Sequence, residues 1–211
     1  MNYIKYPRTL HLPWSEGISN DDKVLKNTKN FDGKRVIISV KMDGENTSLY
    51  KNHYHARSID SQHHPSQSWL KNFHAQIRYK FPRNWRICGE NLYAKHEIHY
   101  HNLKNYFLVF SIWNHKNICI SWDHTKKVAE YLGLDLVPVL YDGLWDPKVA
   151  ESIYNDMYLN DECEGYVVRL YKEFHYDNFA ESCAKFVAFK FKDKIGDEHW
   201  RTKPIIKNEI K

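Results

Sequence analysis

Short runs of β-forming residues, set close together along the chain, constrain the fold of this sequence more than any other feature. Several neighbouring runs are separated by only a few residues, which favours antiparallel pairing, because parallel strands need a longer crossover. Helical periodicity is limited to three segments. Strands therefore outnumber helices, and we predict an α+β fold with antiparallel β-sheets flanked by helices. The expected strands are residues 35–41, 47–50, 53–57, 85–93, 106–113, 118–122, 136–140, 164–171 and 186–191, and the expected helices are 68–81, a segment that Asp123 caps and Gly133 stops, and 147–158.

The chain of 211 residues is long enough for one well-packed domain, and we expect a single domain over residues 1–211. Residues 1–30 read as an irregular N-terminal segment and residues 193–211 as a polar tail. The sequence has no apolar run long enough to span a bilayer and no signal-peptide pattern at its start. We therefore expect a soluble, cytoplasmic protein with no membrane partner.

Cysteine and histidine spacing argues against a disulfide framework and against structural zinc. The four cysteines are far apart, each in an apolar stretch, and suit buried reduced thiols. Thirteen histidines include His53-x-His55 and His96-x-x-His99-x-His101, but no cysteine completes a zinc motif. These histidines either contact nucleic acid or form a satisfied surface cluster. The formal charge of +5 permits a polyanionic partner without requiring one.

Lys41 ends the first β-forming run and is followed by Asp43-Gly44, turn chemistry that predicts a hairpin with a charged amine at its tip. An ammonium group has no lone pair and cannot attack an electrophile. Burial or a neighbouring cation lowers the pKa of a lysine until the neutral amine can form a covalent intermediate. A surface hairpin with a solvated lysine is the alternative interpretation of these residues alone.

Four further stretches place polar residues at the ends of expected strands. Together with Lys41-Met42-Asp43-Gly44 they resemble, in order and spacing, the motifs of the covalent nucleotidyltransferases, the superfamily of ATP-dependent ligases and mRNA capping enzymes. The sequence is most similar to RNA ligases of the phage RNA ligase 2 and RNA-editing type, because Lys41, Gly44 and Asn46 form Lys-x-x-Gly-x-Asn. The four stretches are Ala56-Arg57-Ser58, Cys88-Gly89-Glu90-Asn91, Glu164 to Arg169 and Phe189-Lys190-Phe191-Lys192.

The resemblance implies an adenylation (nucleotidyltransferase) domain that uses ATP. Lys41 would attack the α-phosphate of ATP and become lysyl-AMP, with Glu164 as a further catalytic residue. Lys190 and Lys192 alternate with phenylalanines on one strand and so point the same way. By analogy they would bind the phosphates and help to lower the pKa of Lys41. A solvated strand face is the alternative for this pair.

The resemblance also implies a divalent cation. Carboxylates beside a triphosphate repel it unless a hard cation lies between them, so Mg²⁺ or Mn²⁺ is expected, held partly through water. The candidate ligands are Asp43, Glu90 and Glu164. In the family, the position of Glu90 is also associated with the ribose of the nucleotide.

Three more residues are implied to bind the nucleotide. Arg57 resembles the arginine that meets its phosphate or sugar and the RNA end, and Asn46 resembles the asparagine that aligns the ribonucleotide 3' end. Phe110 resembles the aromatic residue that stacks on adenine, with Ser111 where the family usually has aspartate. A buried strand with Phe107 and Phe110 in the core is the alternative, although alternation places these two on opposite faces.

The expected function is an ATP-dependent RNA ligase that joins RNA 5'-phosphate and 3'-OH ends through lysyl-AMP and RNA-adenylate. Residues 193–211 are too few for an OB domain, so we expect the substrate grip to come from this domain, a partner protein or an extra domain. A minimal DNA ligase or capping-type nucleotidyltransferase is one alternative. A non-catalytic nucleic-acid-binding protein with the same fold is another.

Overall fold

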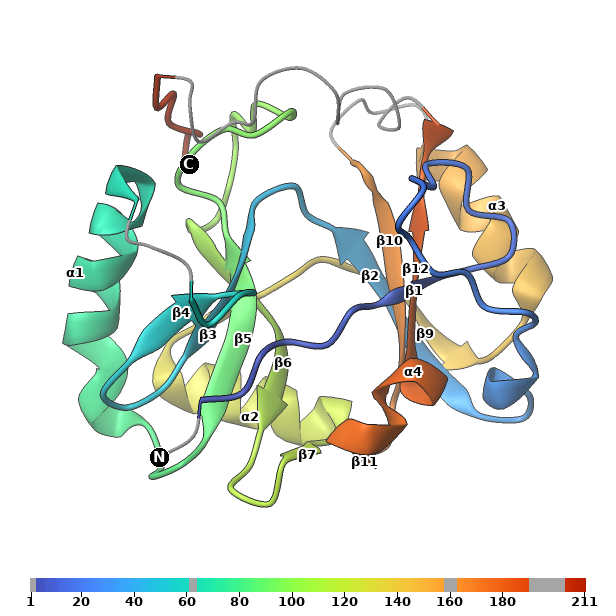
Figure 1. Cartoon of the computed structure of the whole chain (residues 1–211), viewed down its shortest axis with the longest axis horizontal. Helices are drawn as coiled ribbons and strands as arrows, with labels where there is room; N and C mark the ends of the chain where they lie inside the picture. The colour runs from blue at the N-terminus through green and yellow to red at the C-terminus, as the bar shows by residue number, and fades with distance from the viewer. Residues whose placement is uncertain (1–2, 61–63, 158–162, 190–203) are drawn as a thin grey trace.

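Antiparallel pairing dominates the structure, a computed structural model that describes residues 3–60, 64–157, 163–189 and 204–211 (Figure 1). The α+β prediction is confirmed. Sheet A has the strand order β1-β12-β10-β2-β9, made of β1 (Leu10–His11), β12 (Cys183–Val187), β10 (Gly165–Leu170), β2 (Arg35–Lys41) and β9 (Val139–Leu144).

Sheet B has the order β11-β7-β6-β5-β3-β4. Its strand β8 lies outside that path and pairs with β6 in parallel, while β5 lies between β3 and β6 in antiparallel register. The strands are β11 (Phe174–His175), β7 (Ile118–Cys119), β6 (Phe107–Trp113), β5 (Arg86–Asn91), β3 (Glu45–Leu49), β4 (Tyr54–Ala56) and β8 (Asp135–Leu136).

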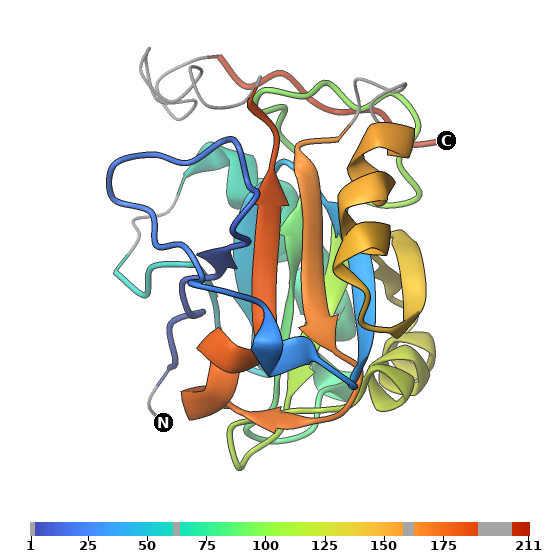
Figure 2. The same ribbon diagram turned by 90° about the vertical axis from the view of Figure 1, so that its right-hand side faces the viewer.

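Helices flank the two sheets (Figures 1 and 2). On α1 (Ser68–Ile77), Leu70 packs in one apolar cluster with side chains of β3, β5 and β6 and with α2 (Trp122–Leu132). Ala150 of α3 (Pro147–Met157) packs in a second cluster with side chains of β2 and β10. The short α4 (Phe179–Ser182) and four 3-10 turns, Lys29–Phe31, Pro65–Gln67, Arg78–Lys80 and Tyr176–Asn178, complete the described elements.

Among the predicted boundaries that are wrong, two lie at the start of α2, where Ser121 takes the capping role. Ser121, rather than Asp123, caps α2: its hydroxyl accepts the N–H of His124 at 3.4 Å. Trp122 therefore belongs to the helix, and the strand expected over 118–122 ends at Cys119. Gly133 ends α2 in the left-handed conformation, with φ of 70°, as predicted.

The expected hairpin around Asp43-Gly44 is also wrong. Strand β2 pairs with β10 and β9 in sheet A, whereas β3 pairs with β4 and β5 in sheet B, so residues 42–44 carry the chain from one sheet to the other. Gly44 permits this crossing, because a Cβ there would lie 2.6 Å from the carbonyl oxygen of Asn91. Lys41 therefore ends its strand between the two sheets.

The N-terminal segment is less irregular than its composition suggests. Its strand β1 pairs in parallel with β12, with His11 opposite Lys185, and Leu12 is fully buried. The segment runs alongside β12 (Figure 2) and lies across the space between the sheets. Burial of Leu12 and the backbone pairing of β1 explain why this proline-interrupted stretch is ordered.

The end of the chain is not a free polar tail. Asn208 is 1% exposed, and its amide donates to the carbonyl oxygen of Leu92 at 2.8 Å. Residues 204–211 lie beside the loop that follows β5 (Figure 1). Residues 193–203 of the expected tail lie outside the described residues.

The remaining expectations concern cysteines and membrane spans. All four cysteines, Cys88, Cys119, Cys163 and Cys183, are buried and free, as predicted. Among the described residues, no helix has both the length and the apolar character that a bilayer crossing requires.

Candidate active site

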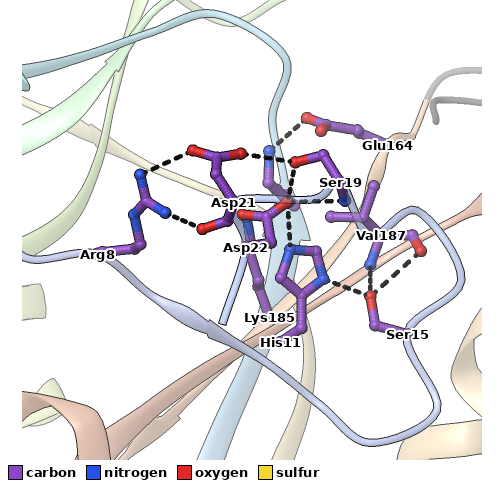
Figure 3. Close-up of polar contacts among 10 residues, drawn as sticks. Arg8, His11, Ser15, Ser19, Asp21, Asp22, Glu164, Lys185 and Val187 are labelled. Atoms are coloured by element: carbon purple, nitrogen blue, oxygen red, sulfur yellow. Dashed lines mark hydrogen bonds and ion pairs between the residues drawn. The ribbon is translucent and has the colours of Figure 1, made fainter. Parts of the chain in front are cut away.

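Lys41 and Glu164 meet because their strands are neighbours. Lys41 at the end of β2 is in register with Gly165 at the start of β10, so Glu164 lies beside it. The Nζ of Lys41 donates a hydrogen bond to the Glu164 carboxylate, and the side chains are 24% and 19% exposed. The structure thus joins two predicted catalytic residues in a partly buried ion pair, and Figure 3 labels the Glu164 partner at its upper right.

The charge state of Lys41 follows from its surroundings. Burial disfavours the ammonium, but attraction to Glu164, and then to Glu90 and Asp43, outweighs burial and raises the pKa of Lys41 above its ordinary value. The described surroundings therefore keep this amine protonated. Lys190 and Lys192, which were expected to lower this pKa, lie outside the described residues.

Asp43 connects the turn after Lys41 to the loop that follows β5. Its Oδ2 accepts the backbone N–H groups of Glu97 at 2.8 Å and Ile98 at 2.7 Å, and its own N–H donates to the hydroxyl of Tyr100 at 2.9 Å. These bonds use the carboxylate to fasten the turn after Lys41 to the loop that follows β5. Asp43 therefore positions the turn after Lys41 in this structure, and its role as a metal ligand stays a prediction.

A cavity of about 750 Å³ lies between the two sheets, beside Lys41. Of the expected nucleotide-binding residues, Asn46, Arg57, Glu90 and Phe110 all line it. Asn46 and Glu90 are paired across β3 and β5 and so share one face of sheet B. The side-chain oxygen Oδ1 of Asn46 is buried and has no hydrogen-bond partner among the described residues, which marks a place for a donor from a ligand.

A β-bulge aims Phe110 into this cavity. Cys88 of β5 is opposite Ser111 and Gly89 is opposite Val109, so Phe110 is the extra residue of β6. The bulge brings both Phe110 and Ser111 to the cavity wall, whereas Phe107 packs toward the helices on the other face. The predicted separation of Phe107 and Phe110 is borne out, and Phe110 meets Tyr6 edge to face at 5.3 Å between ring centroids.

The surroundings of Glu90 favour the protonated form of its carboxyl group. Burial raises the pKa of Glu90 to about 8. The ammonium of Lys41 opposes this shift, and repulsion from Glu164 and Asp43 adds to it. A cation bound beside Glu90 would favour its ionised form and displace the proton. Glu90 is therefore suited to respond to a divalent cation.

Replacing Glu90 with glutamine should remove a pH dependence of stability. Between pH 4.5 and about 8, folded Glu90 holds a proton that the unfolded chain has released. The folded state then binds more protons, so the unfolding free energy of the wild type falls as pH rises through this window. Urea unfolding at several pH values without divalent cations should show this fall relative to Glu90→Gln. Parallel curves for the two proteins would contradict the assignment.

Sequence reasoning missed a second group of charged residues at this cavity, contributed by the N-terminal segment and β12 (Figure 3). Lys185 lies 3.5 Å from one carboxylate oxygen of Asp22, and His11 Nε2 lies 3.2 Å from the other. Arg8 donates to Asp21 at 3.1 Å. Burial, and then repulsion from Lys41, lower the pKa of Lys185. The repulsion reflects how near the amines of Lys41 and Lys185 lie to one another.

One signal in the sequence was available for this group. Lys185 is the only charged residue in the strand Cys183–Val187, and a lysine within an apolar strand is costly unless it has a partner or a role.

The predicted residue Arg57 adds a further cation at the cavity. Its side chain is exposed in part, and the desolvation that remains, followed by repulsion from Arg8, lowers the pKa of its guanidinium group. The cavity therefore gathers cations from segments far apart in sequence.

Comparisons with known proteins agree with this geometry. The chain has the fold of an archaeal ATP-dependent RNA ligase, at a TM-score of 0.61 and 14% identity over 89% of this chain and 49% of that one. It has a similar likeness to a mutant RNA ligase from Naegleria gruberi solved with ATP and Mn, at a TM-score of 0.61 and 16% identity over 90% of this chain and 59% of that one. The Naegleria gruberi enzyme with PPi gives a TM-score of 0.59 at 18% identity, covering 94% and 64%.

This chain thus spans about half to two thirds of the length of those ligases. No curated protein matches it in a direct sequence comparison. A family model described as RNA ligase matches residues 34–187, a range that includes Lys41, Glu90 and Glu164. On that match the chain belongs to the RNA ligase family.

Proposed function

We propose that this protein is an ATP-dependent RNA ligase that joins RNA 5'-phosphate and 3'-OH ends. The observation that carries the proposal is the Lys41–Glu164 ion pair beside a cavity of about 750 Å³. An amine held at the edge of a cavity lined by cations is suited to attack a phosphate ester, because phosphoryl transfer depends on placement and charge compensation.

The cavity fits a nucleoside triphosphate in chemistry and size. Phe110 offers an aromatic face at the bulge, and the buried Asn46 Oδ1 lacks a donor among the described residues. Lys185 and Arg57 add positive charge along the walls. A volume of this size lies within the range of small-molecule sites.

Glu90 and Glu164 fit a divalent cation such as Mg²⁺ or Mn²⁺. Glu90 lines the cavity, and Glu164 lies beside it on the Nζ of Lys41. Both offer the hard oxygen donors that these ions prefer. When bound, the ion would supply charge neutralisation at the phosphates.

In the first step the Nζ of Lys41 would attack the α-phosphorus of ATP. The new bond joins nitrogen to phosphorus, the bond to the β-phosphate oxygen breaks, and pyrophosphate leaves. Lys41 must lose a proton, and any weakening of its pair with Glu164 lowers its pKa toward that state. AMP would then pass to an RNA 5'-phosphate, and a 3'-OH would displace it to seal the strand.

The proposal is tested by incubating the protein with α-labelled ATP and Mg²⁺ or Mn²⁺, and then with nicked RNA and DNA duplexes. We expect a covalent AMP adduct and sealing of RNA ends. An adduct with GTP would favour the capping-type alternative, and sealing confined to DNA would favour a DNA ligase. Nucleic-acid binding without an adduct from ATP, GTP or NAD would favour the non-catalytic alternative.

The way in which RNA is bound is also part of the proposal. The chain spans 49% and 59% of the length of the first two ligases compared. A partner protein or an extra domain would therefore contribute further contacts to the RNA. RNA sealing by this chain alone should then be less efficient than its self-adenylation.

Changing Lys185 to methionine should raise the KM for ATP in adduct formation. A charge-assisted hydrogen bond contributes about 1.5–3 kcal/mol, so the expected rise is about tenfold or more. Lys185→Arg, which keeps the charge beside Asp22, should lose much less. The single-turnover rate of adduct formation against ATP concentration measures both, and equal half-saturating ATP concentrations for wild type and Lys185→Met would exclude a phosphate contact.

A further inference from the structure

The loop after β5 and the end of the chain are locked in one register by backbone hydrogen bonds. Glu209 N donates to the carbonyl oxygen of Tyr100 at 2.8 Å, and Leu103 N donates to the carbonyl oxygen of Glu209 at 3.0 Å. The buried side chain of Asn208 accepts the N–H of Tyr100 at 2.9 Å. These bonds fix the backbone of Glu209 beside the segment that runs from Tyr100 to Leu103.

Three potential metal ligands meet on the outer side of this junction. His101 Nδ1 lies 3.3 Å from one carboxylate oxygen of Glu209, and His99 Nε2 lies 3.9 Å from the other. The two imidazole rings are 4.2 Å apart between centroids. One ligand atom from each of the three residues lies within 4.8 Å of the other two.

We propose that His99, His101 and Glu209 bind a divalent transition-metal ion, with Zn²⁺ as the representative. Two imidazoles and one carboxylate form a common donor set for zinc, and water fills the remaining positions. Mg²⁺ prefers oxygen donors alone, so this set discriminates against the ion expected in the adenylation cavity. None of the three residues is among the described residues that line that cavity.

Binding requires only a small adjustment. Ligands about 2 Å from a tetrahedral ion lie a little over 3 Å from one another, so the three atoms must close by about an ångström. The side chains are 29%, 59% and 57% exposed, which leaves their rotamers free to move. His99 Nε2 is also 3.0 Å from the carbonyl oxygen of Lys207, and binding through this nitrogen would replace that hydrogen bond.

The site would act on the nucleophile turn through Tyr100, which lies between the two histidines in sequence. The Tyr100 hydroxyl accepts the N–H of Asp43, and the same loop provides the two N–H groups bound by the Asp43 carboxylate. A metal ion would pin the last residues of the chain onto this loop. It would thereby stiffen the support of the turn after Lys41.

The test is isothermal titration of untagged protein with Zn²⁺ in excess Mg²⁺, which occupies oxygen-only sites. We expect one Zn²⁺ per chain, and at least about tenfold weaker binding in His101→Ala and in Glu209→Gln, because each removes a ligand. His115→Ala removes an exposed histidine outside the cluster and should bind as the wild type does. Zn²⁺ should also slow amide hydrogen exchange in residues 204–211 of the wild type and of His115→Ala, but not of His101→Ala or Glu209→Gln.

Undetectable Zn²⁺ binding would overturn the proposal. So would equal affinities in the wild type, His101→Ala and Glu209→Gln, since the ion would then be held elsewhere. Circular dichroism of each variant separates loss of the site from loss of the fold. The readouts are binding and exchange, so they stand whether or not the protein ligates RNA.

Discussion

Lys41→Met is expected to abolish the covalent AMP adduct while leaving the fold intact. Methionine matches the length of the lysine stem but offers no nucleophilic nitrogen, so the first chemical step has no acceptor for the α-phosphorus. Lys41 is 24% exposed and its charge is paired with Glu164, so the methionine variant removes an ion pair without opening a core cavity. Intact-protein mass spectrometry after incubation with ATP and Mg²⁺ measures the adduct directly.

The same variant should still seal RNA that already carries AMP on its 5'-phosphate. That substrate enters after the lysine has acted, so its joining needs the cation and the RNA contacts but no amine at position 41. Lys34→Met, which removes an exposed lysine just before β2, is the matched control and should keep both activities. An adduct of normal yield in Lys41→Met would assign the nucleophile to another lysine and overturn the proposed role.

Gly165→Ala is expected to lower the free energy of unfolding by about 4 kcal/mol or more, or to prevent folding. A Cβ at this position would lie 2.0 Å from the carbonyl oxygen of Phe186 on the paired strand β12, and the residue has a φ of +155°. The clash is with backbone, so a side-chain rotation cannot relieve it. Relief would separate β10 from β12, next to Glu164.

Urea or thermal unfolding measures the loss, and Gly33→Ala is the matched control. Gly33 also has a positive φ, of +68°, but a Cβ there meets nothing within 4 Å. Its replacement should cost about 1–2 kcal/mol from backbone strain alone. Equal losses for the two variants would show that the close approach of β12 to Gly165 has no effect on stability.

The first long strand was predicted well because a strand that is buried on both faces has a continuous apolar run in its sequence. The run from Arg35 to Lys41 was placed to the residue, and Gly133 ended its helix as expected. Pairing partners were harder, because they depend on contacts between distant segments. The Asp43-Gly44 turn has the local chemistry of a hairpin, yet the strands it joins find partners in different sheets.

In the candidate site, too, local motifs predicted the residues but not the contacts that tertiary structure sets. Lys41, Asn46, Glu90 and Phe110 were found from local motifs, and the structure brings them to one cavity. The bulge at Phe110 and the ties of Asp43 to the loop after β5 are set by tertiary register, which local sequence does not encode. Lys185 was not predicted, because its partner Asp22 is distant in sequence and contacts it only when β1 pairs with β12.

The parallel pairing of β1 with β12 has a consequence for synthesis on the ribosome. Leu10 is paired with Ala184, so the first strand of sheet A has no partner until the segment around Ala184 has been translated. Until then β2 can pair with β9, but Lys41 lacks the β10 neighbour that brings Glu164. The nascent polypeptide should therefore be unable to react with ATP, and catalytic competence should arise in one late event.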